Sequence, residues 1–189
     1  IIVGKFSGED RFLHVNSLGG GMQYRSTGAL FGHCGAAAAF SIAAASARSK
    51  TSIFTATQQV ESFSSNGPRR MFYDASGNAY TPGNLLASGG LLLNKPDFTA
   101  ADGVVTTVPF PFDHFYGTSA AAPHAAAIAA VLIQHNPSLL TPSLTNLFKA
   151  TSLDIMTAGW DIDSGFGIIM ADAAVKKAVG DSFTSMTLT

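Results

Sequence analysis

The sequence predicts an α/β fold whose sheet is at least partly parallel. One observation is that short apolar or alternating segments, bounded by glycine or proline, recur through the first 108 residues. A second is that three later segments carry the start and stop signals of helices. Strands and helices that follow one another along a chain are typical of layered folds in which helices cover a parallel sheet.

Length and composition limit the class of protein. The 189 residues are enough for one large domain, or a piece of one, with a substantial core. Charged residues make up 12% of the chain and the net charge is -1. Such a chain is too apolar for disorder and too neutral for a protein that binds nucleic acid or a membrane surface. No apolar run approaches the roughly 18 residues of a membrane span, and the single cysteine, Cys34, excludes an internal disulfide.

Five segments are predicted to be strands because they are apolar, alternating or β-branched: residues 1–6, 11–16, 22–24, 41–46 and 103–108. Residues 35–40 are small and rich in alanine, which favours a short, closely packed helix or turn. Residues 66–90 collect glycine, proline, asparagine and serine, and this composition predicts a loop.

The longest predicted helix covers residues 120–135. Ser119 is placed at its N-cap, and Pro123 in its first turn, where a proline loses no hydrogen bond. The small apolar residues that follow predict a helix buried on most sides, with inaccessible alanines at positions 122, 125, 126, 129 and 130.

Two further helices are predicted nearer the end of the chain. One covers residues 141–151, because Thr141-Pro142 is a cap followed by a first-position proline. The other covers residues 171–179, with Asp172 in its first turn and Gly180 beyond its end. A short apolar segment, residues 166–170, lies between them.

Four segments, in order, resemble landmarks of one enzyme family. "GTSAAAPHAAAIAA", residues 117–130, is similar to the nucleophile signature of the subtilisin family, Gly-Thr-Ser-x-Ala-x-Pro-His followed by small residues. "VESFSSNGP" and "DSGFGIIMADAAV" resemble a strand and loop before the signature and a strand and helix after it. "KPDFTAADG" resembles the stretch Lys-Pro-Asp-x-x-Ala-Pro-Gly, but has Ala101-Asp102 in place of proline. The resemblance covers about residues 60–179.

The resemblance implies acyl-transfer chemistry at Ser119. A serine hydroxyl is a poor nucleophile at neutral pH unless a base takes its proton as it attacks. Acyl transfer also needs hydrogen-bond donors aimed at the developing oxyanion. By resemblance, Ser119 is the nucleophile, its backbone amide is an oxyanion donor, and Thr118 assists oxyanion binding. A helix start adds a favourable dipole.

The partners of this serine are missing from the chain. Subtilisin-like enzymes have the chain order Asp, His, Ser. The resemblance therefore places an Asp-Thr/Ser-Gly motif and a His-Gly-Thr motif well upstream, and an Ala-Gly-Asn motif for the oxyanion asparagine. None of these occurs before Ser119.

The histidines that are present offer one alternative base. His114, beside Asp113, lies in the loop before Ser119 and stays open as a candidate. His124 is about 140° round the helix from Ser119, so it is interpreted as structural. His14, His33 and His135 are interpreted as solvated or structural residues.

The sequence thus predicts a partial subtilisin-like parallel-sheet fold, with residues 1–189 forming the C-terminal portion of one peptidase domain. The parent protein is expected to be a serine endopeptidase acting on protein or peptide substrates, and the isolated chain is expected to be inactive. The alternative is a non-catalytic domain in which Ser119 only caps a helix.

The expected partners follow from the same interpretation. We expect the chain to pair with a missing N-terminal portion or to form a homo-oligomer, and to bind no nucleic acid. The resemblance favours a secreted or extracytoplasmic protein. No cofactor and no metal site is predicted, because the acidic residues, such as Asp154, Asp161 and Asp163, or Asp74 with Asn78, form no compact calcium-ligand pattern.

Overall fold

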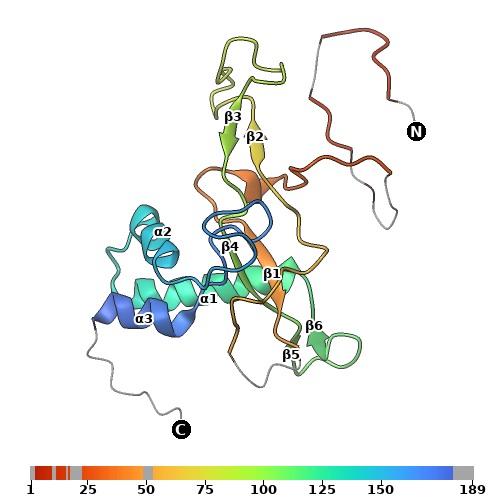
Figure 1. Cartoon of the computed structure of the whole chain (residues 1–189). Helices are drawn as coiled ribbons and strands as arrows, with labels where there is room; N and C mark the ends of the chain where they lie inside the picture. Colours follow the sequence, from red (N-terminus) through yellow and green to blue (C-terminus); the bar gives the residue numbers. More distant parts are fainter. Residues whose placement is uncertain (1–2, 10–11, 16, 18–22, 49–52, 181–189) are drawn as a thin grey trace.

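Two parallel strands form the centre of the computed structural model, which describes residues 3–9, 12–15, 17, 23–48 and 53–180. Strand β1 (Ile42–Ser46) pairs with β4 (Phe98–Asp102), in a register that runs from Ile42 opposite Phe98 to Ser46 opposite Asp102. Figure 1 shows both strands running over helix α1. The predicted α/β fold with a parallel sheet is confirmed.

Shorter backbone contacts extend this ladder beyond β4. Thr99 forms a parallel bridge with Ile168, and Ile168 forms an antiparallel bridge with Leu153. The apolar segment expected at residues 166–170 therefore runs beside β4, with Gly167 and Ile169 hydrogen-bonded to Thr99 on either side of the bridge. Parallel neighbours need a crossover, and here the long stretch containing α1 and α2 supplies it.

Two small antiparallel hairpins project from the central body (Figure 1). Strand β2 (Arg69–Met71) pairs with β3 (Leu91–Leu93), so β2 lies inside the loop expected at residues 66–90 and β3 follows directly after it. Strand β5 (Val104–Val105) pairs with β6 (His114–Phe115), and occupies only the start of the strand expected at 103–108. Prolines at 109 and 111 have no amide to donate, so the ladder is short.

The strands expected near the N-terminus do not form in the described residues. Residues 3–6, 12–15, 23 and 24 have no strand, whereas residues 1–2, 11, 16 and 22 of these predicted strands lie outside the described part. Val3 and Phe6 are exposed, with Phe6 fully so. Alternation predicts a strand only where a neighbouring strand is present to pair with it. At residues 35–40 the structure has turns that follow a 3-10 helix, η1 (His33–Gly35).

The helices pack on the central strands and on one another. Helix α1 (Thr118–His135) contacts β1 and β4, α3 (Ala171–Val179) packs on α1, and α2 (Thr141–Lys149) packs on α3. The bounds of α3 agree with those expected. Helix α2 ends earlier than residue 151, because Thr151 and Ser152 both turn back to the carbonyl of Phe148.

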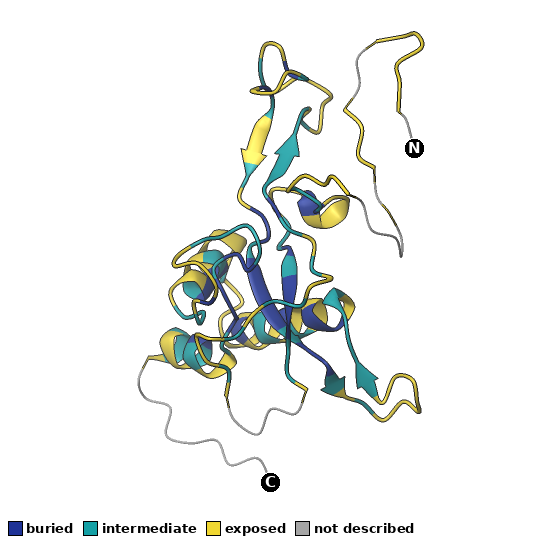
Figure 2. Cartoon of the chain, turned by 45° about the vertical axis from the view of Figure 1, so that its right-hand side comes forward, coloured by how far each residue is buried: buried dark blue, intermediate teal, exposed yellow. Residues whose placement is uncertain are grey.

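Helix α1 differs from its prediction in two ways. It begins at Thr118, so Pro123 lies inside the helix rather than in its first turn, and Ser119 loses the helical partner of its carbonyl. Only one face is buried, through Ala120, Ala121, Ala125 and Leu132. The expectation was wrong for the exposed alanines at 122, 126 and 130 and for the half-buried one at 129. The sheet covers one side, and the described residues leave the other open (Figure 2).

Aromatic side chains fill the core between the strands and the helices. Phe98 is fully buried and lies edge-on to Phe40 and Phe148, with ring centroids 5.6 Å apart in each pair. Such edge-to-face contacts add to the free energy gained by burying the rings. Phe166 closes the cluster at 6.0 Å from Phe98.

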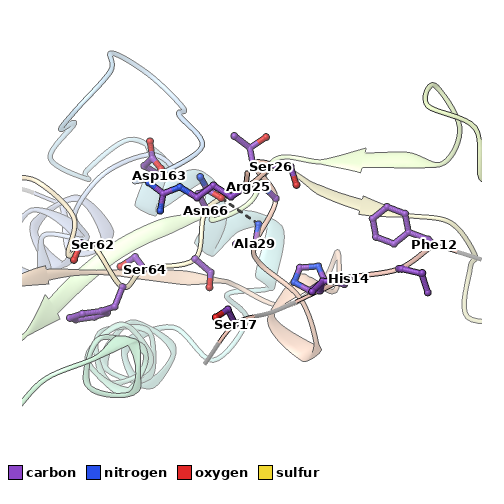
Figure 3. Close-up of a pocket in the computed structure, with 16 residues that line it drawn as sticks. Phe12, His14, Ser17, Arg25, Ser26, Ala29, Ser62, Ser64, Asn66 and Asp163 are labelled. Atoms are coloured by element: carbon purple, nitrogen blue, oxygen red, sulfur yellow. Dashed lines mark hydrogen bonds between the residues drawn. The ribbon is translucent and has the colours of Figure 1, made fainter. Parts of the chain in front are cut away.

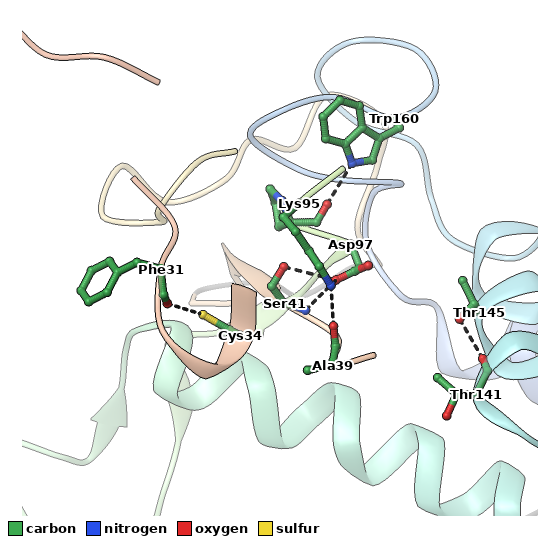
Figure 4. A network of polar contacts seen from close by, with 10 residues as sticks. Phe31, Cys34, Ala39, Ser41, Lys95, Asp97, Thr141, Thr145 and Trp160 are labelled. Carbon is green, nitrogen blue, oxygen red and sulfur yellow. Dashed lines mark hydrogen bonds and ion pairs between the residues drawn. The ribbon is translucent and has the colours of Figure 1, made fainter. Parts of the chain in front are cut away.

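A buried ion pair holds the beginnings of the two central strands together (Figure 4). Lys95 Nζ lies 2.6 Å from Asp97 Oδ2 and also donates to the carbonyl of Ala39. The same Asp97 oxygen accepts the amide of Ser41 at 2.7 Å and its hydroxyl at 3.2 Å. Both charges are therefore paired and hydrogen-bonded, as a buried ion pair requires.

We predict that Lys95→Met lowers the free energy of unfolding by about 3–5 kcal/mol, because it leaves the Asp97 carboxylate without its charge partner. Urea denaturation measures this loss. Lys176→Met is the control, since Lys176 and Asp172 form an exposed pair, 3.6 Å apart, at the surface of α3. That change is expected to cost less than about 1 kcal/mol. Equal losses in the two variants would contradict the prediction.

Candidate functional site

Ser119 lies at the start of α1 with its side chain exposed. Within the described residues its hydroxyl makes no hydrogen bond, either to a base or to the helix backbone. The N-cap residue is Gly117, and α1 has no side-chain cap. The expectation that Ser119 caps the helix is therefore wrong, since the helix begins one residue before the serine and its hydroxyl is left free.

The turn before Ser119 depends on Gly117. This residue has φ 112° and ψ 162°, a backbone region that is essentially restricted to glycine. Its carbonyl accepts the amides of Ala120 at 2.8 Å and Ala121 at 3.2 Å. In the described part of the chain, the amides of Thr118 and Ser119 donate to no protein acceptor.

This arrangement suits the stabilisation of a developing negative charge. Two free backbone amides lie next to the hydroxyl of Ser119, and the positive end of the helix dipole adds to their effect. The structure therefore places Thr118 and Ser119, the predicted oxyanion residues, together at the helix start. Their role in an oxyanion site stays a prediction.

The sequence analysis missed a buried carboxylate at this turn. Asp102, the last residue of β4, is fully buried, and its Oδ2 accepts the Gly117 amide at 2.8 Å. Asp102 was treated only as the boundary of a strand. One signal in the sequence could have revealed Asp102. In the stretch that resembles Lys-Pro-Asp-x-x-Ala-Pro-Gly, Ala101-Asp102 stands in place of the proline.

No histidine reaches Ser119 in the described residues. His114 Nδ1 lies 3.3 Å from Asp113 Oδ2, on the β5–β6 hairpin, and is bonded to no other group described. His124 Nδ1 contacts the carbonyl of Ala120 at 2.7 Å, one turn back on its own helix, so a structural role fits it. The His14 ring lies 5.0 Å from that of Phe31 in a tilted arrangement, and His33 and His135 are exposed.

Ser119 lines neither of two hollows found among the described residues. The larger, about 710 Å³, lies between residues 12–15, 17 and 25–29 and the 62–66 loop (Figure 3). Its labelled side chains include Arg25, Asn66 and Asp163. The smaller, about 390 Å³, is an apolar groove between α1 and α3, lined by Val131, Val175 and Val179 among others.

The acidic residues weighed as metal ligands are held by local donors. Asp161 Oδ1 accepts the amides of Asp163 and Ser164, and its Oδ2 accepts the Ser164 hydroxyl. Asp154 accepts the Gly159 amide. Over the described ranges, no three histidine, cysteine or acidic side chains lie together as metal ligands would. Likewise, none of the helices described is long and apolar enough to cross a bilayer.

Comparisons with known proteins identify the family. The model of the Subtilase family matches residues 4–177. Fervidolysin from Fervidobacterium pennivorans is 38% identical over 65 residues, which is 34% of this chain and 9% of that protein. The minor extracellular protease Epr from Bacillus subtilis is 32% identical over 111 residues, 50% of this chain and 17% of that protein. The matches thus span less than a fifth of either relative.

Solved structures show the same fold. The S41 psychrophilic protease superposes with a TM-score of 0.50 at 24% identity, over 77% of this chain and 44% of that one. At this identity the likeness concerns the fold alone.

A prediction concerns Asp74, which was weighed as a calcium ligand with Asn78. The side-chain amide of Asn78, first, and then its backbone amide hold the pKa of Asp74 below its ordinary value. We expect Asn78→Ala to raise the Asp74 pKa toward that value, as measured by NMR titration of the carboxyl carbon. Because the folded pKa is lowered, the carboxylate stabilises the loop above the unfolded pKa, and this effect is lost as the pH falls through the folded pKa. An unchanged pKa would contradict the prediction.

Proposed function

We propose, from the premise that this chain belongs to the Subtilase family, that it supplies the nucleophile of a serine endopeptidase. In this proposal Ser119 attacks the peptide carbonyl and forms an acyl-enzyme. The amide of Ser119 and the Thr118 residue stabilise the oxyanion. Protein or peptide chains are the substrates.

The observation that carries the proposal is the free hydroxyl of Ser119. It is exposed at a helix start and is bonded to no described residue. A serine retained only to start the helix would use its hydroxyl as a cap, as serines at helix starts commonly do. Here Gly117 occupies the cap position, so the hydroxyl is available for chemistry.

We further infer that the base, its aspartate partner and the oxyanion asparagine lie upstream in a longer polypeptide. Their motifs do not occur before Ser119. The chain spans 9% of fervidolysin and 17% of Epr, which leaves room in proteins of that length for the missing groups. The runner-up is a non-catalytic family member, in which the same hydroxyl has no base.

The exposed face of α1 supports the idea of a larger domain. Ala126, Ala130, Val131 and Ile133 are exposed on a helix that is apolar on nearly all sides. A helix of this kind is normally buried all round. We propose that the upstream portion of the polypeptide covers this face.

We predict that the 189-residue chain does not react with a fluorophosphonate probe, whereas the full-length gene product is labelled at Ser119. Losing triad members removes most of the rate, and one oxyanion donor alone is worth about 10²–10³ in turnover. Active-site labelling followed by mass spectrometry of the modified peptide measures this.

Two variants of the full-length product serve as controls. Ser119→Ala should abolish labelling. Ser143→Ala should leave it unchanged, because Ser143 is also exposed in the first turn of a helix, α2. Rapid labelling of the 189-residue chain would contradict the upstream base and would make His114 the leading candidate. An unlabelled full-length product would favour the non-catalytic runner-up.

We also predict that the 189-residue chain self-associates through the exposed face of α1. Sedimentation velocity should show a dimer or larger species, and Ile133→Glu should shift it to a monomer by placing a charge on that face. Val105→Glu is the matched control, because Val105 is more exposed but lies on β5. A wild-type chain that sediments as a monomer would contradict the prediction and favour the runner-up.

A further inference from the structure

We propose that Asp102 is a positioning residue, which fixes the turn that presents Ser119 by holding the Gly117 amide. The inference rests on the proposed function, because Ser119 is taken as the nucleophile. It adds a residue from the central sheet to the machinery around that serine.

The contact joins the end of the sheet to the beginning of the helix. Asp102 is the last residue of β4 and lies opposite Ser46 at the end of β1. Its Oδ2 is 2.8 Å from the amide of Gly117, fifteen residues later in the chain. The main-chain carbonyl of Asp102 accepts the Ala47 amide at 2.8 Å, so its own backbone is held by β1.

The stability of the fold does not account for this carboxylate. Its second oxygen, Oδ1, is buried and has no hydrogen-bond partner in the described residues. A buried carboxylate with one hydrogen-bond donor lowers the stability of the fold, because it loses its hydration and gains only one hydrogen bond in return. Polar groups that break this rule are expected mainly at functional sites.

Asp97, which directly precedes β4, provides a comparison, because its carboxylate has a structural role. One of its oxygens receives the Lys95 ammonium together with the amide and hydroxyl of Ser41. Among the described residues the Asp102 carboxylate has one donor, the Gly117 amide, which belongs to the turn before the proposed nucleophile. The contrast assigns Asp102 to the turn rather than to the sheet.

The effect on Ser119 passes through the backbone. Gly117 has a φ of 112°. Because glycine can adopt many other backbone conformations, a contact from outside the turn is needed to hold this one. The hydrogen bond to the carboxylate fixes the plane of the peptide between Tyr116 and Gly117, where the chain enters the turn. The free amides of Thr118 and Ser119 and the serine hydroxyl are then held in one orientation, which is the kind of preorganisation that catalysis requires.

The test compares Asp102→Ala and Asp102→Asn with Asp97→Asn, a half-buried control that lies just before the same strand. In the 189-residue chain, amide hydrogen exchange at Gly117 is measured by NMR. We expect Asp102→Ala to lower Gly117 protection by at least about tenfold. Asp102→Asn keeps an acceptor oxygen and should retain most of it, and Asp97→Asn should leave it unchanged relative to neighbouring amides.

The second readout is the rate of fluorophosphonate labelling in the full-length gene product. Asp102→Ala should slow labelling by roughly 10- to 100-fold, with substantial rescue by Asn, whereas Asp97→Asn should not. Unchanged Gly117 protection in Asp102→Ala, or equal slowing by Asp97→Asn, would overturn the proposal. If wild-type Ser119 is not labelled at all, the proposed function fails, and the exchange measurement alone decides whether Asp102 holds the turn.

Discussion

The register of β1 against β4 is the constraint on which the rest of the structure depends. Five residues of each strand pair in parallel, and a carboxylate stands at each end of β4. Asp97 ties the beginning of the ladder to Ser41 and Lys95, and Asp102 ties its end to Gly117. A slip by one residue would exchange the two faces of the strand and break both contacts. The position of Ser119 thus follows from the pairing of the sheet.

The elements that could be predicted are those whose signals are local. Residues 171–179 form a helix with the expected bounds, because Asp172 and Gly180 mark its ends within the sequence. The small apolar residues of β1 predicted a buried strand, and Ala44 and Ala45 are fully buried. Small side chains are required there, since α1 packs directly on these strands.

The elements that could not be predicted depend on distant partners. Residues 3–6 and 12–15 alternate like a strand, but a strand forms only beside another one. Strand β4 is stabilised by β1 and by Ile168, which are far away in the sequence. Helix α1 begins earlier than predicted, because Gly117 and its contact with Asp102 determine the turn, rather than a serine cap.

The candidate site shows the same division. The motif around Ser119 predicts this residue as the candidate nucleophile, since the spacing of glycine, serine and proline is visible in the sequence alone. The free hydroxyl of Ser119 among the described residues, and the contact of Asp102 with Gly117, are properties of the folded chain.

Helix α1, which carries Ser119, is packed firmly along one face, whereas some backbone groups at its start have no hydrogen-bond partner among the described residues. Its buried face packs on the central strands through Ala120, Ala121 and Ala125, whose short side chains allow close approach. Pro123 removes the helical partner of the Ser119 carbonyl, and the amides of Thr118 and Ser119 have no acceptor in the described part of the chain. Unpaired backbone groups lower the stability of a helix start, so they persist where the surrounding structure holds them. Asp102 and the sheet provide that support from beneath, which leaves the solvent side of the turn free for a reacting group.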